Sequence, residues 1–307
     1  MKVTVSAWDP GYSESSDRIT DPNKTRLNLD VEVDSGEWRP MKATVPPPSR
    51  VLLVDGVRRL DARVDIDVDG QPSPGLCASY AAGVVVCDLA AHSRSAAIAA
   101  SRVERGLFSA AAQQDLSAGL TVSYRARRVH TTEPNDLVNA VQERLTRLEI
   151  DVAGEADPTE DDLLVIDGAL RHRAHLPRAV GFVKSHHRRY LSGLQADVVH
   201  RLEPGQRTPV FEIGTNWRRH SWYLRLPGGS GAWGGVARLE APSTEDLAID
   251  EVVRLADTST VVLPGLASSA HKDPRAPQNL TPIAGLERML RAKLGDPRLL
   301  LRNLRSR

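Results

Sequence analysis

Two apolar runs of nearly the same sequence, VLLVDG at 51–56 and LLVIDG at 163–168, constrain the fold more than any other feature of the chain. Each run has the length of a strand and lacks the alternation typical of a strand with one face in solvent, so both are predicted to be buried. Each run also stops on Asp-Gly. Ordinary turns are one explanation, because Asp-Gly is a favourable turn sequence. The other explanation is that two buried strands deliver Asp55 and Asp167 to one place.

The segments around these runs predict a mixed α/β fold, with a sheet flanked by helices. Further strands are predicted at 62–70, 80–90, 120–128, 179–185, 210–240 and 260–265. Helices are predicted at 95–116, 133–154, 243–256 and 282–295. The PPPS break at 46–49 sets off residues 1–49 as an N-terminal, β-rich extension, and 50–307 form the main domain, with additional strands and helices toward the C-terminus.

Composition excludes several classes of protein. No run of 18 or more apolar residues occurs, so no membrane span is expected. The first residues lack the apolar stretch of a signal peptide, and two cysteines, Cys77 and Cys87, make no disulfide framework. A net charge of +1 gives no global basic field. A cytoplasmic protein without a membrane partner is expected.

A buried aspartate at a strand end is costly unless it is paired or binds a cation. Asp55 and Asp167 on neighbouring strands would repel each other, and a divalent metal would neutralise both. Two ions roughly 4 Å apart, held by several carboxylates, catalyse in-line displacement at phosphorus. Carboxylate oxygens suit Mg²⁺ or Mn²⁺.

The helix predicted at 133–154 offers a third carboxylate. With Leu137 at zero, Glu149 falls about 70° from the centre of the apolar stripe, and Glu143 about 190° from it. Glu149 is therefore expected at the edge of the buried face, just before the strand that carries Asp167. The alternative is a boundary glutamate paired with an arginine such as Arg144 or Arg147.

Basic residues supply the remaining candidates. Lys184 ends the apolar strand VGFVK and is either a phosphate-binding lysine beside the carboxylates or a surface lysine. Arginine clusters interleaved with tryptophans could hold phosphates and stack bases, or could be solvated faces beside core tryptophans. The nucleic-acid-binding candidates are Arg58, Arg188, Arg189, Arg218 and Arg219.

Other chemistries find little support. The histidines at 172, 175, 186 and 187 lack the glutamate of H-E-x-x-H and a cysteine pair, which disfavours a zinc hydrolase. No G-x-S-x-G follows a strand, and no G-x-G-x-x-G follows the first core strand. A serine hydrolase and a dinucleotide-binding enzyme are therefore not expected.

The order of the short motifs resembles the NurA nuclease family. VDGVRR closes the first core strand, RLTRLEID carries a helical glutamate, IDGAL closes the second aspartate strand, and VGFVKS ends in lysine. The resemblance implies an RNase H-like core, DNA cleavage with two Mn²⁺ or Mg²⁺ ions, a homodimer, and a HerA-type hexameric ATPase as partner. It covers residues 50–290.

Carried over by the resemblance, Asp55, Glu149 and Asp167 are expected metal ligands, and Lys184 is expected near the scissile phosphate. The family's Ala-His pair that opens the last helix has no histidine in the corresponding stretch RAPQNLTPIAGLER, so His271 and Asp273, just upstream, are the candidate substitutes. A catalytically weak docking subunit for a DNA-translocating ATPase is the alternative function. A related enzyme acting on RNA or hybrids is a third possibility.

Overall fold

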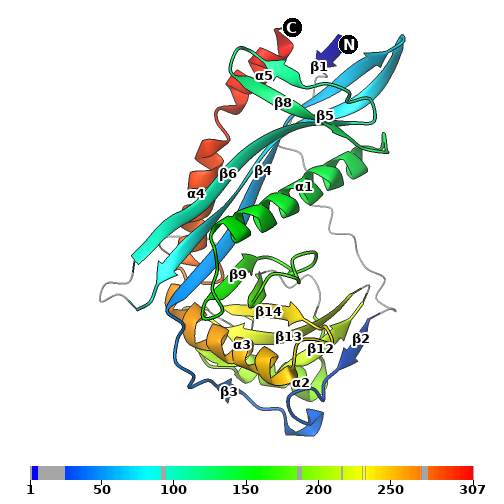
Figure 1. Cartoon of the computed structure of the whole chain (residues 1–307). Coiled ribbons are helices and arrows are strands. Elements are labelled where there is room, and N and C mark those ends of the chain that lie inside the picture. The colour runs from blue at the N-terminus through cyan, green and yellow to red at the C-terminus, as the bar shows by residue number, and fades with distance from the viewer. Residues whose placement is uncertain are drawn as a thin grey trace.

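The computed structural model describes residues 2–5, 25–90, 95–184, 189–215, 217–229, 231, 233–269, 271 and 276–306. Most of its strands join one mixed sheet, which is largely antiparallel and partly parallel and is flanked by helices (Figure 1). The main path through the sheet has the spatial order β2-β12-β13-β14-β10-β9-β4-β5-β6-β8-β7. The predicted mixed α/β class is therefore confirmed.

The strands are β1 (Lys2–Val5), β2 (Arg26–Asn28), β3 (Met41–Lys42), β4 (Arg50–Val68), β5 (Gln71–Asp88), β6 (Ser95–Ser109), β7 (Leu116–Ala118), β8 (Val122–Arg128), β9 (Leu163–Asp167), β10 (Ala179–Val183), β11 (Gln206–Arg207), β12 (Phe211–Gly214), β13 (Arg218–Arg225) and β14 (Val236–Pro242). The α-helices are α1 (Pro134–Glu155), α2 (Gly193–Arg201), α3 (Ile249–Val262), α4 (Thr281–Lys293) and α5 (Pro297–Arg305). Two 3₁₀ turns, η2 (Ser35–Glu37) and η3 (Leu263–Leu266), complete the described elements.

The centre of the sheet positions the candidate site. The long strands β4, β5 and β6 form an antiparallel set, and α1 follows β8 and leads into β9. Strand β9 pairs parallel to β4, and β10 pairs parallel to β9. Because parallel neighbours end at the same edge, the carboxyl ends of β9 and β10 lie together beside the middle of β4.

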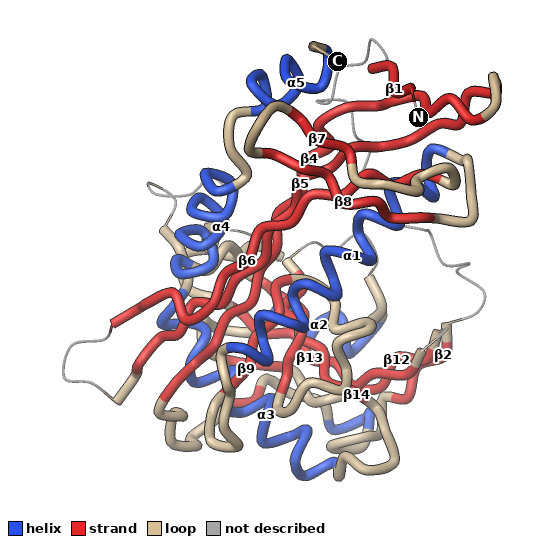
Figure 2. The backbone as a smooth tube through the Cα atoms, turned by 45° about the horizontal axis from the view of Figure 1, so that its top comes forward, coloured by secondary structure: helices blue, strands red, loops and turns tan. Residues whose placement is uncertain are grey.

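Helices bury both faces of this centre (Figure 2). On one face, Leu145, Leu148 and other apolar residues of α1 pack against Leu52 and Val54 of β4. On the opposite face, α3 and α4 pack against a separate cluster that includes Leu53. Successive residues of β4 and β9 therefore point alternately toward α1 and toward α4.

The described strands of residues 1–49 are added to the sheet at three places. Strand β1 pairs with the far end of β4, β2 with β12, and β3 with β11. Cys77 and Cys87 are buried and unpaired, as expected of ordinary core thiols. None of the described helices is long and apolar enough to cross a bilayer.

The helix predicted at 95–116 is wrong, because residues 95–109 form β6. Alanine favours helices by well under 1 kcal/mol per residue over most other residues. This preference is outweighed by pairing with β5, which runs from Ser95 opposite Asp88 to Ser109 opposite Gly75. The buried end of the segment, Leu107 and Phe108, belongs to the core.

The strand predicted at 260–265 is also wrong. Residues 260–262 continue α3, and 263–266 form η3. The hydroxyls of Ser259 and Thr260 both donate to the backbone carbonyl of Ala256, which satisfies these buried side chains within the helix. Pro264 then stops the α-helical bonding pattern.

Candidate metal centre

Asp55 and Asp167 meet on one face of the sheet. Val54 pairs with Ile166 in the parallel ladder of β4 and β9, so the two aspartates occupy the next position along each strand. Leu53 and Val165, two residues earlier, both lie in the cluster under α3 and α4. Since the side-chain period of a strand is two, the aspartates point to that same face. The two Asp-Gly motifs therefore do lie on adjacent strands.

Only the second motif ends its strand. β9 stops at Asp167, and Gly168 follows with a φ of 103°. Asp55-Gly56, predicted to close the first core strand, lies instead in the middle of β4, which continues to Val68. The strand continues because β5 pairs with it along its whole length. Among the described strands, β9 flanks the other edge of β4 only up to Val54, and β1 pairs there from Val64 onward.

Lys184 lies beside these carboxylates. Its ammonium nitrogen is 2.6 Å from Oδ2 of Asp167 and 2.8 Å from Oδ1 of Asn279. Asn279 is fully buried two residues before α4 begins, so the lysine is held between β9 and the segment that enters α4. The predicted location of Lys184 near the aspartates is confirmed.

The two aspartates have too little compensating charge when no cation is bound. Burial and the negative charge of Asp167 raise the pKa of Asp55 from 3.8 to about 8, against the opposing effects of Lys184 and of the backbone N–H of Gly56. That N–H donates to Oδ1 of Asp55 at 2.7 Å. Asp55 therefore holds a proton near neutral pH. A bound cation would supply the same positive charge and would displace that proton.

Glu149 approaches from the opposite face. It is 5% exposed, so its predicted position on the buried side of α1 is confirmed, and Glu143 is exposed as predicted. Its partner is neither Arg144 nor Arg147 but Arg173, in the loop after β9, whose guanidinium also donates to the carbonyl of Ala169 at 3.0 Å. Burial raises the pKa of Glu149 even though Arg173 acts to lower it.

Gly56 is where Glu149 reaches the strand. A Cβ at this position would lie 2.5 Å from Oε1 of Glu149 and 2.7 Å from Cδ1 of Leu145. We expect Gly56→Ala to lower the free energy of unfolding by ~1–3 kcal/mol, the usual cost of overpacking. Urea titration measures this loss of stability. The control is Gly154→Ala in α1, the helix that carries Glu149, because a Cβ at Gly154 contacts nothing within 4 Å. Equal effects of the two substitutions would contradict the proposed contact.

The described residues do not assemble the complete predicted ligand set. Among them, no three His, Cys, Asp or Glu side chains converge closely enough to hold a metal ion. Glu149 is engaged by Arg173, His271 is exposed in a turn, and Asp273 lies outside the described residues. Asp55 and Asp167 fit one hard divalent cation, because they are adjacent, oxygen-only and short of positive charge. Glu149 could join them only by exchanging its arginine.

The raised pKa of Asp55 predicts a pH-dependent stability. A folded-state pKa above the ordinary value makes the fold less stable as pH rises from about 4 through about 8, because the folded protein retains the proton. At ~1.4 kcal/mol per pKa unit, the loss is on the order of several kcal/mol. With chelator present, we expect the melting temperature to fall between pH 6 and pH 9, and to fall less in Asp55→Asn. Parallel curves for the two proteins would contradict this.

The arginines predicted to bind nucleic acid are scattered. Arg58 is half-buried on β4, three residues past Asp55, and has no hydrogen-bond or ion-pair partner among the described residues. Arg189 is exposed and lies over the ring of Trp233, and Arg218 is exposed and bound to Glu212. Arg219 is buried against Glu240, so its donors face the protein rather than a ligand. Arg188 lies outside the described residues.

Sequence reasoning missed three residues that build the site: Arg173, Asn279 and Glu240. Glu240 is 1% exposed on β14 and accepts hydrogen bonds from Arg219, Arg238 and the backbone N–H of Leu170, so it anchors the loop after Asp167. Asn279 lies within RAPQNLTPIAGLER, the stretch that lacks the family's histidine, and its only sequence signal is a polar residue just before a predicted helix. No local pattern distinguishes Arg173 from the other arginines.

No known protein-family model matches the sequence, and no curated protein matches it. The function is therefore inferred from the arrangement of the residues themselves.

Proposed function

We propose that this protein is a divalent-metal-dependent DNA nuclease with an RNase H-like core. The observation that carries the proposal is the pair Asp55 and Asp167, which share one face of two adjacent parallel strands, with Lys184 bound to Asp167. The strand order β6-β5-β4-β9-β10, with α1 entering before β9, supports the core. Buried, under-compensated carboxylates at the end of a parallel strand pair are suited to a metal-assisted reaction at phosphorus.

In this proposal Asp55 and Asp167 hold Mn²⁺ or Mg²⁺, which when bound polarises the phosphodiester and lowers the pKa of a coordinated water. Lys184 donates to a phosphate oxygen, and Asn279 keeps its ammonium group directed at the site. Arg58 is half-buried and pairs with Tyr80 on the α1 face of β4, opposite the face of Asp55, so it would contact DNA only on that side of the strand. Glu149 serves as the third ligand after it leaves Arg173.

The proposed biological setting is cytoplasmic DNA end processing or defence against foreign DNA, by exonuclease cleavage with endonuclease cleavage as a second activity. The proposed partners are DNA, a HerA-type hexameric ATPase and a second copy of the chain. The near-neutral charge supports dependence on such a partner, because it gives little long-range attraction for DNA.

The experiment is degradation of end-labelled linear duplex and single-stranded DNA, with Mn²⁺ or with chelator, and with an RNA of the same sequence beside them. Metal-dependent cutting of DNA is expected. Cutting of RNA in preference to DNA would move the proposal to a ribonuclease. No cutting of any substrate, with or without a translocating ATPase, would contradict a nuclease.

A second candidate function is a catalytically weak subunit that docks the ATPase. The counter-ions in the site favour it, because Arg173 and Lys184 already neutralise Glu149 and Asp167. Such a subunit need not bind a divalent metal, so metal affinity separates the two candidates.

A further inference from the structure

The outer edge of β6 is open along most of its length. β6 pairs with β5 on its inner side from Ser95 to Ser109, but on its outer side it pairs with β8 only from Gly106 onward. No other described strand lies beside 95–105. A bulge at Ala99 interrupts this edge, so its regular stretch is 100–105. The N–H and C=O groups that point outward from 100–105 are therefore available to another strand.

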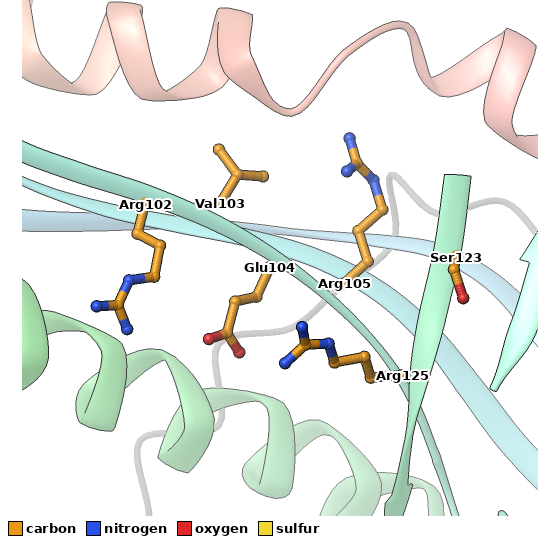
Figure 3. Close-up of a pocket in the computed structure, with 6 residues that line it drawn as sticks. All are labelled: Arg102, Val103, Glu104, Arg105, Ser123 and Arg125. Atoms are coloured by element: carbon orange, nitrogen blue, oxygen red, sulfur yellow. The ribbon is translucent and has the colours of Figure 1, made fainter. Parts of the chain in front are cut away.

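A notch lies beside this stretch, in the place of a missing strand. It has a volume of about 460 Å³ and is lined by Arg102, Val103, Glu104 and Arg105 of β6 and by Ser123 and Arg125 of β8 (Figure 3). Successive side chains of a strand point to opposite faces of the sheet. A cavity lined by consecutive residues of one strand therefore lies at the edge of that strand and not over one face. The notch is the gap where β6 and β8 diverge, in the plane of the sheet.

The side of the notch that faces α1 has an unpaired positive charge. Glu104, on this side, is bound by Arg127 at 3.2 Å and by Arg144 at 2.9 Å. Arg125 precedes Arg127 by two residues on β8, so it lies on the same side of the sheet (Figure 3). Arg125 is exposed and has no hydrogen-bond or ion-pair partner among the described residues. Its guanidinium is therefore free for an anion from outside the chain.

The other two arginines of the notch add donors but no negative charge. Arg102 pairs with Asp151 and Glu155 of α1, and both carboxylates are more than 40% exposed. Arg105, on the opposite side of β6, donates to the carbonyl of Leu294 at 3.1 Å. Its buried Nε has no acceptor in the described part of the chain. A segment that enters the notch thus meets basic groups on both of its faces.

An extended acidic peptide fits this edge better than other anions. A peptide backbone both donates and accepts hydrogen bonds, so it can pair with the outward N–H and C=O groups of β6, whereas a phosphodiester only accepts them. A second copy of β6 would not supply the negative charge. The only carboxylate within 95–105 is that of Glu104, which is already paired.

We propose that the edge of β6 from 100 to 105 binds an extended, acidic segment of a partner protein by strand addition. The added strand runs antiparallel to β6, the pairing that is more stable per residue. Its alternate carboxylates lie on one side of the strand, where Arg125 binds them. This surface does not rest on the proposed nuclease function.

Fluorescence anisotropy with a labelled synthetic peptide, DSDVTVTV, tests the proposal on the full chain. The peptide is expected to bind the wild type. Two control peptides are expected to bind at least ~10-fold more weakly. One has the same sequence but methylated amide nitrogens, so it cannot donate hydrogen bonds to the edge. The other, KSKVTVTV, can pair with the edge but is repelled by the arginines.

Two protein variants locate the binding. Arg125→Glu is expected to weaken binding of DSDVTVTV at least ~10-fold, because it replaces the free guanidinium with a like charge. Arg128→Glu is the control and should leave the affinity unchanged. Arg128 is exposed on the same strand, but it lies three residues further on and therefore on the opposite side of the sheet. Hydrogen exchange of the amides at 100–105 is expected to slow when the peptide is bound.

Absence of binding by DSDVTVTV would overturn the proposal, including the case in which a second copy of the chain already covers the edge. Equal binding of the methylated peptide would show attraction of charges without strand addition, and equal effects of Arg125→Glu and Arg128→Glu would place the peptide elsewhere. Either result would also overturn the proposal. None of these measurements uses DNA or metal, so they are independent of nuclease activity.

Discussion

Asp167→Asn is expected to reduce Mn²⁺-dependent DNA cleavage at least ~100-fold, the scale on which loss of one group that stabilises the transition state acts. The substitution removes one of the two carboxylates that share a face of the sheet and leaves Lys184 without its anionic partner. It should not unfold the protein, because it also relieves the repulsion that raises the pKa of Asp55. Initial rates on an end-labelled duplex at saturating Mn²⁺ measure the effect.

Asp61→Asn is the matched control. Asp61 lies on the same strand as Asp55 and is also buried, but it accepts hydrogen bonds from Ser79, Tyr124 and Arg59, outside the candidate site. This variant should lose stability and retain its cleavage rate per folded molecule. If both substitutions reduced cleavage alike, or neither did, the chemistry would not lie at Asp167.

Glu240→Gln is expected to lower the free energy of unfolding by ~3–5 kcal/mol, the cost of removing one partner from a buried ion pair. Arg219 and Arg238 are both buried, and in the variant they would keep their positive charges without a counter-ion. Although burial acts to raise it, these two arginines hold the pKa of Glu240 below its ordinary value, so the carboxylate is charged in the folded protein. Denaturant titration at pH 7 measures the loss.

The control for Glu240 is Glu212→Gln on β12, which β13 separates from β14 in the same sheet. Its partner Arg218 is 69% exposed, and exposed ion pairs contribute only ~0–1 kcal/mol. Glu240→Gln should also weaken cleavage, because the Glu240 carboxylate holds the backbone N–H of Leu170 at 3.0 Å, three residues after Asp167. Equal stability losses at the two glutamates would show that Glu240 is not the anchor of that loop.

The sequence predicted the strands that hold the site, because their signals are local. The continuous apolar runs at 51–54 and 163–166 predict two buried strands, which are paired in the structure. The apolar stripe of α1 predicts Glu149 at the edge of its buried face, and Glu149 is buried. The sequence did not predict that β4 continues through Asp55-Gly56. That continuation depends on pairing with β5, a non-local interaction that overrides the turn preference of Asp-Gly.

The partners of Glu149 and Lys184 in the site could not be predicted for the same reason. Arg173 reaches Glu149 only because the loop after β9 folds back toward α1, and Asn279 meets Lys184 across 95 residues of sequence. The alanine-rich composition of β6 predicts a helix, whereas the observed strand conformation is set by pairing with β5.

Direct binding of Mn²⁺ to the purified protein tests the metal centre most directly. Titration calorimetry at pH 7.5 would compare the wild type with Asp55→Asn, Asp167→Asn and the control Asp61→Asn. The wild type and Asp61→Asn are expected to bind Mn²⁺ with the same affinity, and each site variant to bind at least ~10-fold more weakly. No binding by the wild type, or equal binding by all four proteins, would contradict a metal centre at Asp55 and Asp167.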